Sequence, residues 1–217
     1  MPNPSRLFIG LSLIALTTVF TQCPKERYPP DPQFSFKQSV DIAPYALNYS
    51  VGDTVWVHLS VPGKSLFDTI SNKYVLYDSA NFSTDIRVVL LFNDPFIANG
   101  SRLASFVYTP GISAYESFSQ TATDAQVSFG CNQATNYDLL VGIVFQQKGV
   151  FGISLSGSVQ KCFSSNYSYT PLNFYFNVPD AHFDYYSQLP FADINQQPDG
   201  NVLSALIHKS VVCVNVR

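Results

Sequence analysis

Charged side chains are scarce in this 217-residue chain. Only 12% of the residues are Asp, Glu, Lys or Arg, and the formal net charge is −3 with no basic cluster. Nucleic-acid-binding proteins need clustered Lys and Arg to neutralise phosphates, so the composition argues against a nucleic-acid partner. In contrast, 46% of the residues are hydrophobic. A packed core is therefore expected, and disorder of the whole chain is not.

Histidine and glutamate, which commonly perform acid–base and metal chemistry, are also few. The chain has three His, and Glu occurs only at positions 26 and 116. The sequence contains no Cys-x-x-Cys, Gly-x-Ser-x-Gly or His-Glu-x-x-His motif and no glycine-rich phosphate loop. The common zinc, hydrolase and nucleotide sites therefore have no support. We predict a protein that is not an enzyme and needs no cofactor.

One histidine leaves a metal-site alternative open. In the stretch DAHFD, Asp180, His182 and Asp184 alternate and would place three ligands on one side of a metal ion in an extended loop. We favour a polar turn after Pro179, because no second group of ligands can be assigned. An Asp-centred or metal-dependent secreted enzyme is kept as an alternative function.

Aromatic residues are abundant, with 18 Phe and 13 Tyr, and this composition is typical of β-strands. Residues 54–61 (TVWVHLSV) alternate strictly, with Val and Leu on one face. Similar runs separated by Gly, Asn, Asp and Pro predict strands at 34–40, 85–92, 103–108, 125–130, 138–146, 150–157, 171–178 and 211–216. We expect residues 34–217 to form one mainly β domain, an antiparallel β-sandwich.

Four segments are interpreted differently. Residues 62–84 are polar and weakly patterned, and we expect a long loop or excursion there. The run QQKGVFGISL is interpreted as a hairpin with Lys148 and Gly149 near its tip. Apolar residues recur at helical spacing within 200–209, which predicts a short helix before the final strand. Residues 182–189 are a second candidate for a helical turn, so a C-terminal helical appendage is expected over about 179–217.

The amino-terminal segment has the pattern of an export signal. Arg6 precedes about 14 largely apolar residues, 7–20, and this run is shorter than the ~20 residues of a membrane span. Cys23 follows the run. Four prolines then occur within 23–33, and proline favours an extended, stiff chain.

The first 23 residues resemble a bacterial lipoprotein signal, in which a peptidase cuts before a cysteine that carries lipid. Phe20 and Gln22 stand where the usual motif has Leu and a small residue. The resemblance implies a signal peptide at 1–22, an acylated Cys23 in the membrane and a proline-rich tether at 23–33. The alternative is that Cys23 is an ordinary cysteine after a conventional signal peptide.

Three stretches of the remaining chain also carry a resemblance: VGDTVWVHLSVPGK, FQQKGVFGISL and the last strand with Cys213. They resemble uncharacterised secreted lipoproteins of the Bacteroidota type that contain an Ig-like sandwich, so the resemblance implies an Ig-like antiparallel β-sandwich. The resemblance implies export to the bacterial cell envelope, with anchoring at the outer membrane or cell surface. It brings no known activity, and the implied partners are the lipid membrane, through Cys23, and an unknown protein or glycan.

Three further cysteines, Cys131, Cys162 and Cys213, are available for a disulfide in an oxidising compartment. They allow one bridge and one free thiol, and the spacing does not decide the pair. We favour Cys162–Cys213, which would join the C-terminal appendage to the sandwich. Cys131–Cys162, whose segments flank two adjacent strands, is the alternative, and three reduced, buried thiols are a further one.

The aromatic-rich stretches NYSYTPLNFYF and HFDYY supply another functional alternative. If Tyr167, Tyr169, Tyr175, Tyr185 and Tyr186 were exposed together, they would form a platform for sugar rings or a protein partner. Core packing is the simpler interpretation. The leading hypothesis is therefore a membrane-anchored envelope lipoprotein with a non-catalytic binding or structural sandwich, and a carbohydrate-binding module is the first alternative.

Overall fold

The computed structural model describes residues 34–92, 102–163, 169–189 and 200–217. Phe34–Arg217 form one compact unit. The predicted signal peptide, Cys23 and the predicted tether lie outside the described residues.

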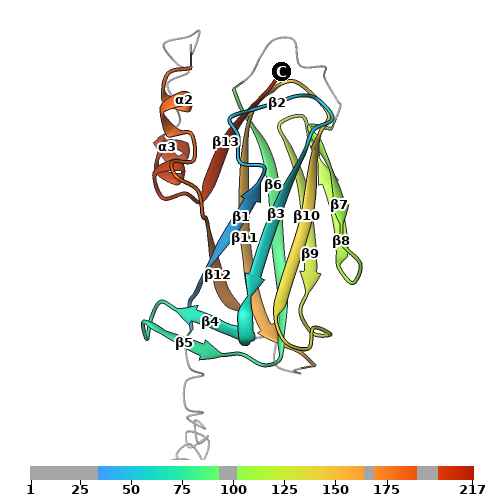
Figure 1. The fold of residues 1–217 in the computed structure, drawn as a ribbon, viewed down its shortest axis with the longest axis vertical. Helices are drawn as coiled ribbons and strands as arrows, with labels where there is room; N and C mark the ends of the chain where they lie inside the picture. Colours follow the sequence, from blue (N-terminus) through green and yellow to red (C-terminus); the bar gives the residue numbers. More distant parts are fainter. Residues whose placement is uncertain (1–33, 93–101, 164–168, 190–199) are drawn as a thin grey trace, which may run out of the picture. The chain divides into compact units, whose positions relative to one another are not determined.

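Two layers of β-sheet enclose the core of this unit (Figure 1). The first layer contains, in order, β7 (Ala104–Tyr108), β10 (Tyr137–Phe145), β3 (Thr54–Val61) and the end of β1 (Phe36–Ala43). The second contains the beginning of β1, β12 (Thr170–Phe176), β11 (Gly149–Lys161), β6 (Ala80–Phe92), β9 (Ala122–Phe129) and β8 (Ser113–Phe118). This arrangement confirms the predicted Ig-like β-sandwich.

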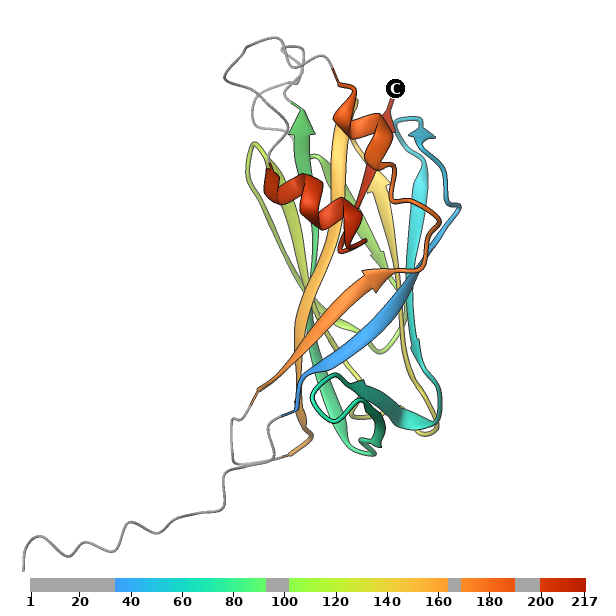
Figure 2. The same cartoon turned by 90° about the vertical axis from the view of Figure 1, so that its left-hand side faces the viewer.

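Shorter elements extend the second layer. They are β13 (Val211–Val216) beside β11, β2 (Asn48–Tyr49) beside β13, and a hairpin of β4 (Ser65–Asp68) and β5 (Lys73–Leu76) beside β1. The short helix η1 (Pro62–Lys64) immediately precedes β4. The helices α2 (Phe183–Ser187) and α3 (Gly200–Ile207) come before β13, as predicted. Figures 1 and 2 place the helices and the hairpin at opposite ends of the same side of the unit.

Strand β1 belongs to both layers. Its residues 36–40 pair in parallel with β12, and its residues 41–43 pair antiparallel with β3. A second parallel pair joins β13 to β2, so the sandwich is not antiparallel throughout. Since Val40 and Ile42 are both buried, the switch between layers occurs without a break in the core.

The core is built from alternate residues of the facing strands. The four inward residues of β3 are fully buried: Val55, Val57, Leu59 and Val61. Rings from opposite layers meet, with the centroids of Phe82 and Tyr137 4.9 Å apart. Burying one such side chain contributes roughly 1.5–3 kcal/mol, so the period-2 pattern of 54–61 directs this strand into the sandwich.

The segment 62–84, expected to be a long loop or excursion, is an excursion with regular structure. This segment contains η1, β4, β5 and the beginning of β6. Both β4 and β5 have only four residues, and β5 is largely exposed. A strand of this kind lacks the buried apolar face on which sequence periodicity depends.

The prediction of a hairpin with Lys148 and Gly149 near its tip is wrong. β10 pairs with β3 and β7, whereas β11 pairs with β6, β12 and β13. The chain therefore crosses from one layer to the other between these strands. Phe145 and Phe151 are both fully buried, and their rings stack with centroids 5.8 Å apart. The two strands bury these rings by facing each other across the core instead of sharing an edge.

The favoured disulfide Cys162–Cys213 is wrong, and the alternative pair Cys131–Cys162 is the one present. Cys213 is a buried free thiol on β13, opposite Gly152 of β11. Cys162 lies ten residues farther along the chain, beyond the other end of β11, which corresponds to roughly 30 Å of extended strand. A disulfide needs Cα atoms within about 7 Å, and the Cα atoms of Cys131 and Cys162 are 5.7 Å apart.

Candidate ligand-binding groove

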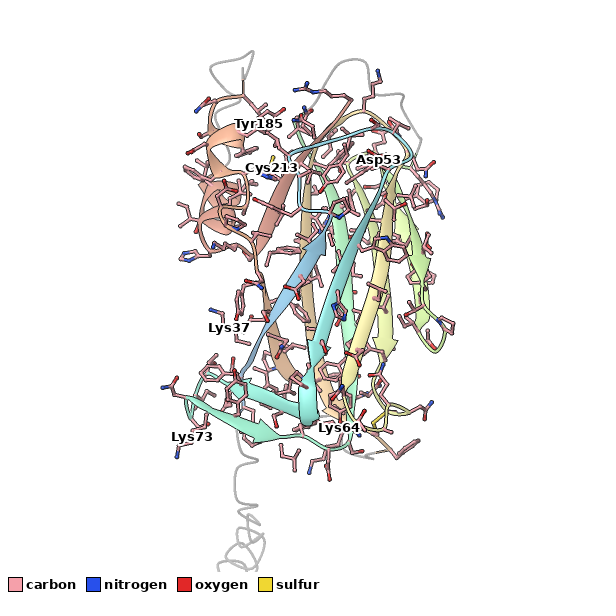
Figure 3. The ribbon with its side chains drawn as sticks, viewed as in Figure 1. Lys37, Asp53, Lys64, Lys73, Tyr185 and Cys213 are labelled. Atoms are coloured by element: carbon pink, nitrogen blue, oxygen red, sulfur yellow. A yellow bond between two sulfur atoms is a disulfide. The ribbon has the colours of Figure 1, made fainter. Side chains whose placement is uncertain are left out.

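A groove lies on the outer face of the second layer, where the β4–β5 hairpin meets β1 and β12. It has a volume of about 300 Å³. Its described lining consists of Lys37, Gln38, Ser39, Phe67, Tyr74 and Tyr175. Figure 3 shows Lys37 projecting outward from the sheet on the side of the hairpin.

Strand pairing places these side chains in a row. Lys37 of β1 is paired with Phe67 of β4, and Phe67 with Tyr74 of β5. Ser39 is paired with Tyr175 of β12. Directly paired residues share one face of a sheet, as do residues two apart on one strand. The residues between them, such as Phe36 and Phe174, are buried in the core. These groove residues therefore face outward from strands whose alternate residues face the core.

Three aromatic rings and one cation dominate the groove. The rings of Phe67 and Tyr74 meet edge to face, with centroids 5.4 Å apart and an interplanar angle of 67°. The Lys37 Nζ lies 4.7 Å from the centroid of the Tyr175 ring, which is a cation–π distance. Tyr74 is 73% exposed. The arrangement offers aromatic faces and a positive charge to solvent.

The hairpin that carries two of the rings is held by Asp68. The carboxylate of Asp68 accepts hydrogen bonds from the backbone N–H groups of Ser35 (3.0 Å) and Ser71 (2.9 Å). Hydrogen bonds from Ser71, and then from the Ser35 backbone, lower the pKa of Asp68 to about 2. Asn72 closes the turn with a φ of +54°, which Asn tolerates better than most residues. These contacts fix Tyr74 relative to β1.

Two of the three candidate metal ligands come together, but in a hydrogen-bonded network. The Tyr45 hydroxyl donates to Asp180 Oδ1 at 2.5 Å, and the backbone N–H of His182 donates to the same oxygen at 2.9 Å. His182 Nδ1 lies 2.6 Å from the carbonyl oxygen of Cys213, to which it donates. The Tyr45 ring stacks on His182 at 4.7 Å. This network joins the chain around Tyr45 to the beginning of α2 and to β13.

The contacts of this network shift the pKa values of two of its side chains. Burial, and then the hydrogen bond to Asp180, raise the pKa of Tyr45 well above its usual value. The hydrogen bond from Tyr45 lowers the pKa of Asp180. Asp184 is not part of the network, and the described segments contain no group of three or more His, Cys, Asp or Glu able to hold a metal ion.

The candidate tyrosines do not form one exposed platform. Tyr169 is exposed just before β12, Tyr185 is half-buried on α2, and Tyr186 is buried in the core. Tyr167 lies outside the described residues. Among the described aromatic residues that were singled out from the sequence, Tyr175 alone lines the groove. Phe67 and Tyr74 were missed because they lie within the segment 62–84, where no strands were expected.

Membrane attachment falls largely outside what the structure describes, because Cys23 is among residues 1–33. In the segments it does describe, no helix has the length and apolar character to span a bilayer.

No protein-family model matches the chain, and no curated protein matches its sequence. Solved structures that are similar over part of the chain include the following two. The type II cohesin dyad from the adaptor ScaA scaffoldin of Acetivibrio cellulolyticus is 7% identical, with a TM-score of 0.33, over 65% of this chain and 46% of the dyad. The collagen-binding domain of a Staphylococcus aureus adhesin is 10% identical, with a TM-score of 0.26, over 63% of this chain and 93% of that domain. Function must therefore be inferred from the chain's own residues.

Proposed function

We propose that this protein is an exported lipoprotein of the bacterial cell envelope. It is anchored through an acylated Cys23 and presents a β-sandwich that binds a ligand without catalysis. The observation that carries the binding role is the aromatic groove. Tyr74 is 73% exposed, on a hairpin whose strand pairing and Asp68 contacts fix its position. A large ring exposed in a concave site adds little to folding stability and is typical of a binding site.

Export is supported by the Cys131–Cys162 disulfide, because disulfides persist mainly in oxidising compartments. The apolar run 7–20 before Cys23 supports a lipoprotein signal. The proline-rich 23–33 would then space the sandwich from the membrane surface.

The non-catalytic role is supported by the composition of the groove. Its six described lining residues supply aromatic faces, three hydroxyls and an ammonium group, while the Gln38 amide donates to the carbonyl oxygen of Ser60. These groups bind and orient a ligand. None of the six is a carboxylate, His or Cys, and no hydrogen bond joins the Ser39 hydroxyl to the Lys37 amine that would have to activate it as a nucleophile.

The anchor is tested by metabolic labelling with an alkyne-bearing fatty acid in a Gram-negative host that processes lipoproteins. We expect the full chain to incorporate the label and to fractionate with membranes. The Cys23→Ser chain should lose the label, whereas Cys213→Ser, a matched cysteine removal, should keep it. A wild-type chain without label, or label retained by Cys23→Ser, would contradict the anchoring proposal.

A further inference from the structure

We propose that the groove beside the β4–β5 hairpin binds carboxylate-bearing sugar units, as found in polysaccharides that contain uronic acids. This inference rests on the proposed binding function and names its ligand class. Three features of the groove carry it: its rings, its hydrogen-bonding groups and its charge.

The rings suit the flat apolar face of a pyranose. Tyr74 and Tyr175 come from β5 and β12, on either side of the β1 and β4 residues that form the floor. Phe67 holds the Tyr74 ring by an edge-to-face contact at 5.4 Å. Rings that rigid strands hold in place lose little conformational entropy when a ligand stacks on them.

Polar groups at the same site are free to bind sugar hydroxyls. Among the described residues, the Ser39 hydroxyl and the phenols of Tyr74 and Tyr175 make no hydrogen bond to another residue. A sugar ring offers both an apolar face and hydroxyls around its edge. The groove therefore matches a saccharide better than a purely apolar segment, which would bury these polar groups without partners.

The charge of the groove selects an anionic ligand. Lys37 makes no ion pair with another described residue, whereas Arg87 and Arg102 pair with Asp124 and Glu116. No described lining residue carries a negative charge. One ammonium group suits a single carboxylate. A sulfated or phosphorylated polymer would favour several cations and the bidentate fork of Arg.

The test measures binding of the full-length lipoprotein, solubilised in detergent, to polygalacturonate, alginate and hyaluronate by calorimetry. We expect at least one of these uronate polymers to bind, and its carboxyl-esterified form to bind roughly fivefold more weakly. Lys37→Met should reduce binding of the acid form by a similar factor and leave the ester unchanged. Tyr74→Ala should weaken both forms by roughly tenfold, because stacking does not depend on charge.

Lys73→Met is the matched control. It removes the same charge from the hairpin beside the groove, and Lys73 does not line the groove, so binding should be unchanged. The inference is overturned if no uronate polymer binds, or if acid and ester bind equally and Lys37→Met has no effect. Binding only to members of a peptide library, lost in Tyr74→Ala, would overturn the saccharide assignment while leaving the proposed binding function intact.

Discussion

At the scale of single residues, the tightest backbone constraint lies at Gly130, between β9 and Cys131. Its φ of +115° falls in a region that residues with a Cβ rarely adopt. A Cβ there would lie 2.4 Å from the carbonyl oxygen of Ala80 and 2.9 Å from a ring carbon of Phe82. Both neighbours are buried and cannot move aside easily. Glycine is therefore required where the chain leaves β9 for the disulfide.

We expect Gly130→Ala to lower the free energy of unfolding by roughly 3 kcal/mol, from backbone strain and steric overlap together. Gly111→Ala is the control: φ is +89°, yet nothing lies within 4 Å of its Cβ position. It should lose only the strain contribution, roughly 1 kcal/mol. Urea unfolding of the oxidised proteins measures both losses. Equal losses of unfolding free energy in the two variants would mean that the structure around Gly130 relaxes and removes the steric overlap.

At the scale of elements, a buried apolar face determined what was predictable. β3 and β13 were expected with the bounds that they have, because alternate residues of β3 and nearly all of β13 are buried. β8 was not expected, since nearly all of its residues are exposed and impose no alternation. The short helix α3 was predicted because its apolar residues recur at helical spacing.

The groove was missed for a related reason. It depends on which strands become neighbours, and β1 pairs with β12 from the far end of the chain. Tyr175 lies in a stretch that was already notable for its aromatic residues. Phe67 and Tyr74 lie on two four-residue strands that sequence periodicity does not reveal. The local sequence pattern predicts single strands and helices. A site assembled by long-range strand pairing can be predicted only when the order of the strands in the sheet is known.

The disulfide joins the chain after β9 to the chain after β11, across a separation of 31 residues. Closing a loop of this length stabilises the fold by roughly 3–4 kcal/mol in the chain-entropy model. We expect the Cys131→Ser/Cys162→Ser double variant to lose about this much. Dithiothreitol should reduce the stability of the wild-type chain to the same level, measured by urea unfolding.

Cys213→Ala provides the control for that experiment. Burial raises the pKa of the Cys213 thiol to about 12, so little thiolate is present to exchange with the disulfide. We expect the Cys213→Ala chain to keep its full sensitivity to dithiothreitol. A Cys213→Ala chain that no longer responds to reduction would show that Cys213 takes part in the bond.

At the scale of the whole molecule, β1 makes the two layers of residues 34–217 depend on each other. Its first half completes the second layer beside β12, and its second half completes the first layer beside β3. Phe36 and Val57 lie in different layers, and both belong to one buried cluster. A substitution that destabilises one layer should therefore also destabilise the other, through β1 and the shared core.

This dependence predicts a single unfolding transition. Trp56, the only tryptophan, lies on β3 and reports on the first layer, whereas far-UV circular dichroism reports on both. We expect the two signals to coincide in urea. Phe36→Ala, a core truncation in the second layer, should destabilise by roughly 3–5 kcal/mol and shift both curves equally. If this substitution moved the dichroism curve and left the Trp56 curve in place, the layers would unfold independently. β1 would then be a connection between two sheets, not a structural element that both share.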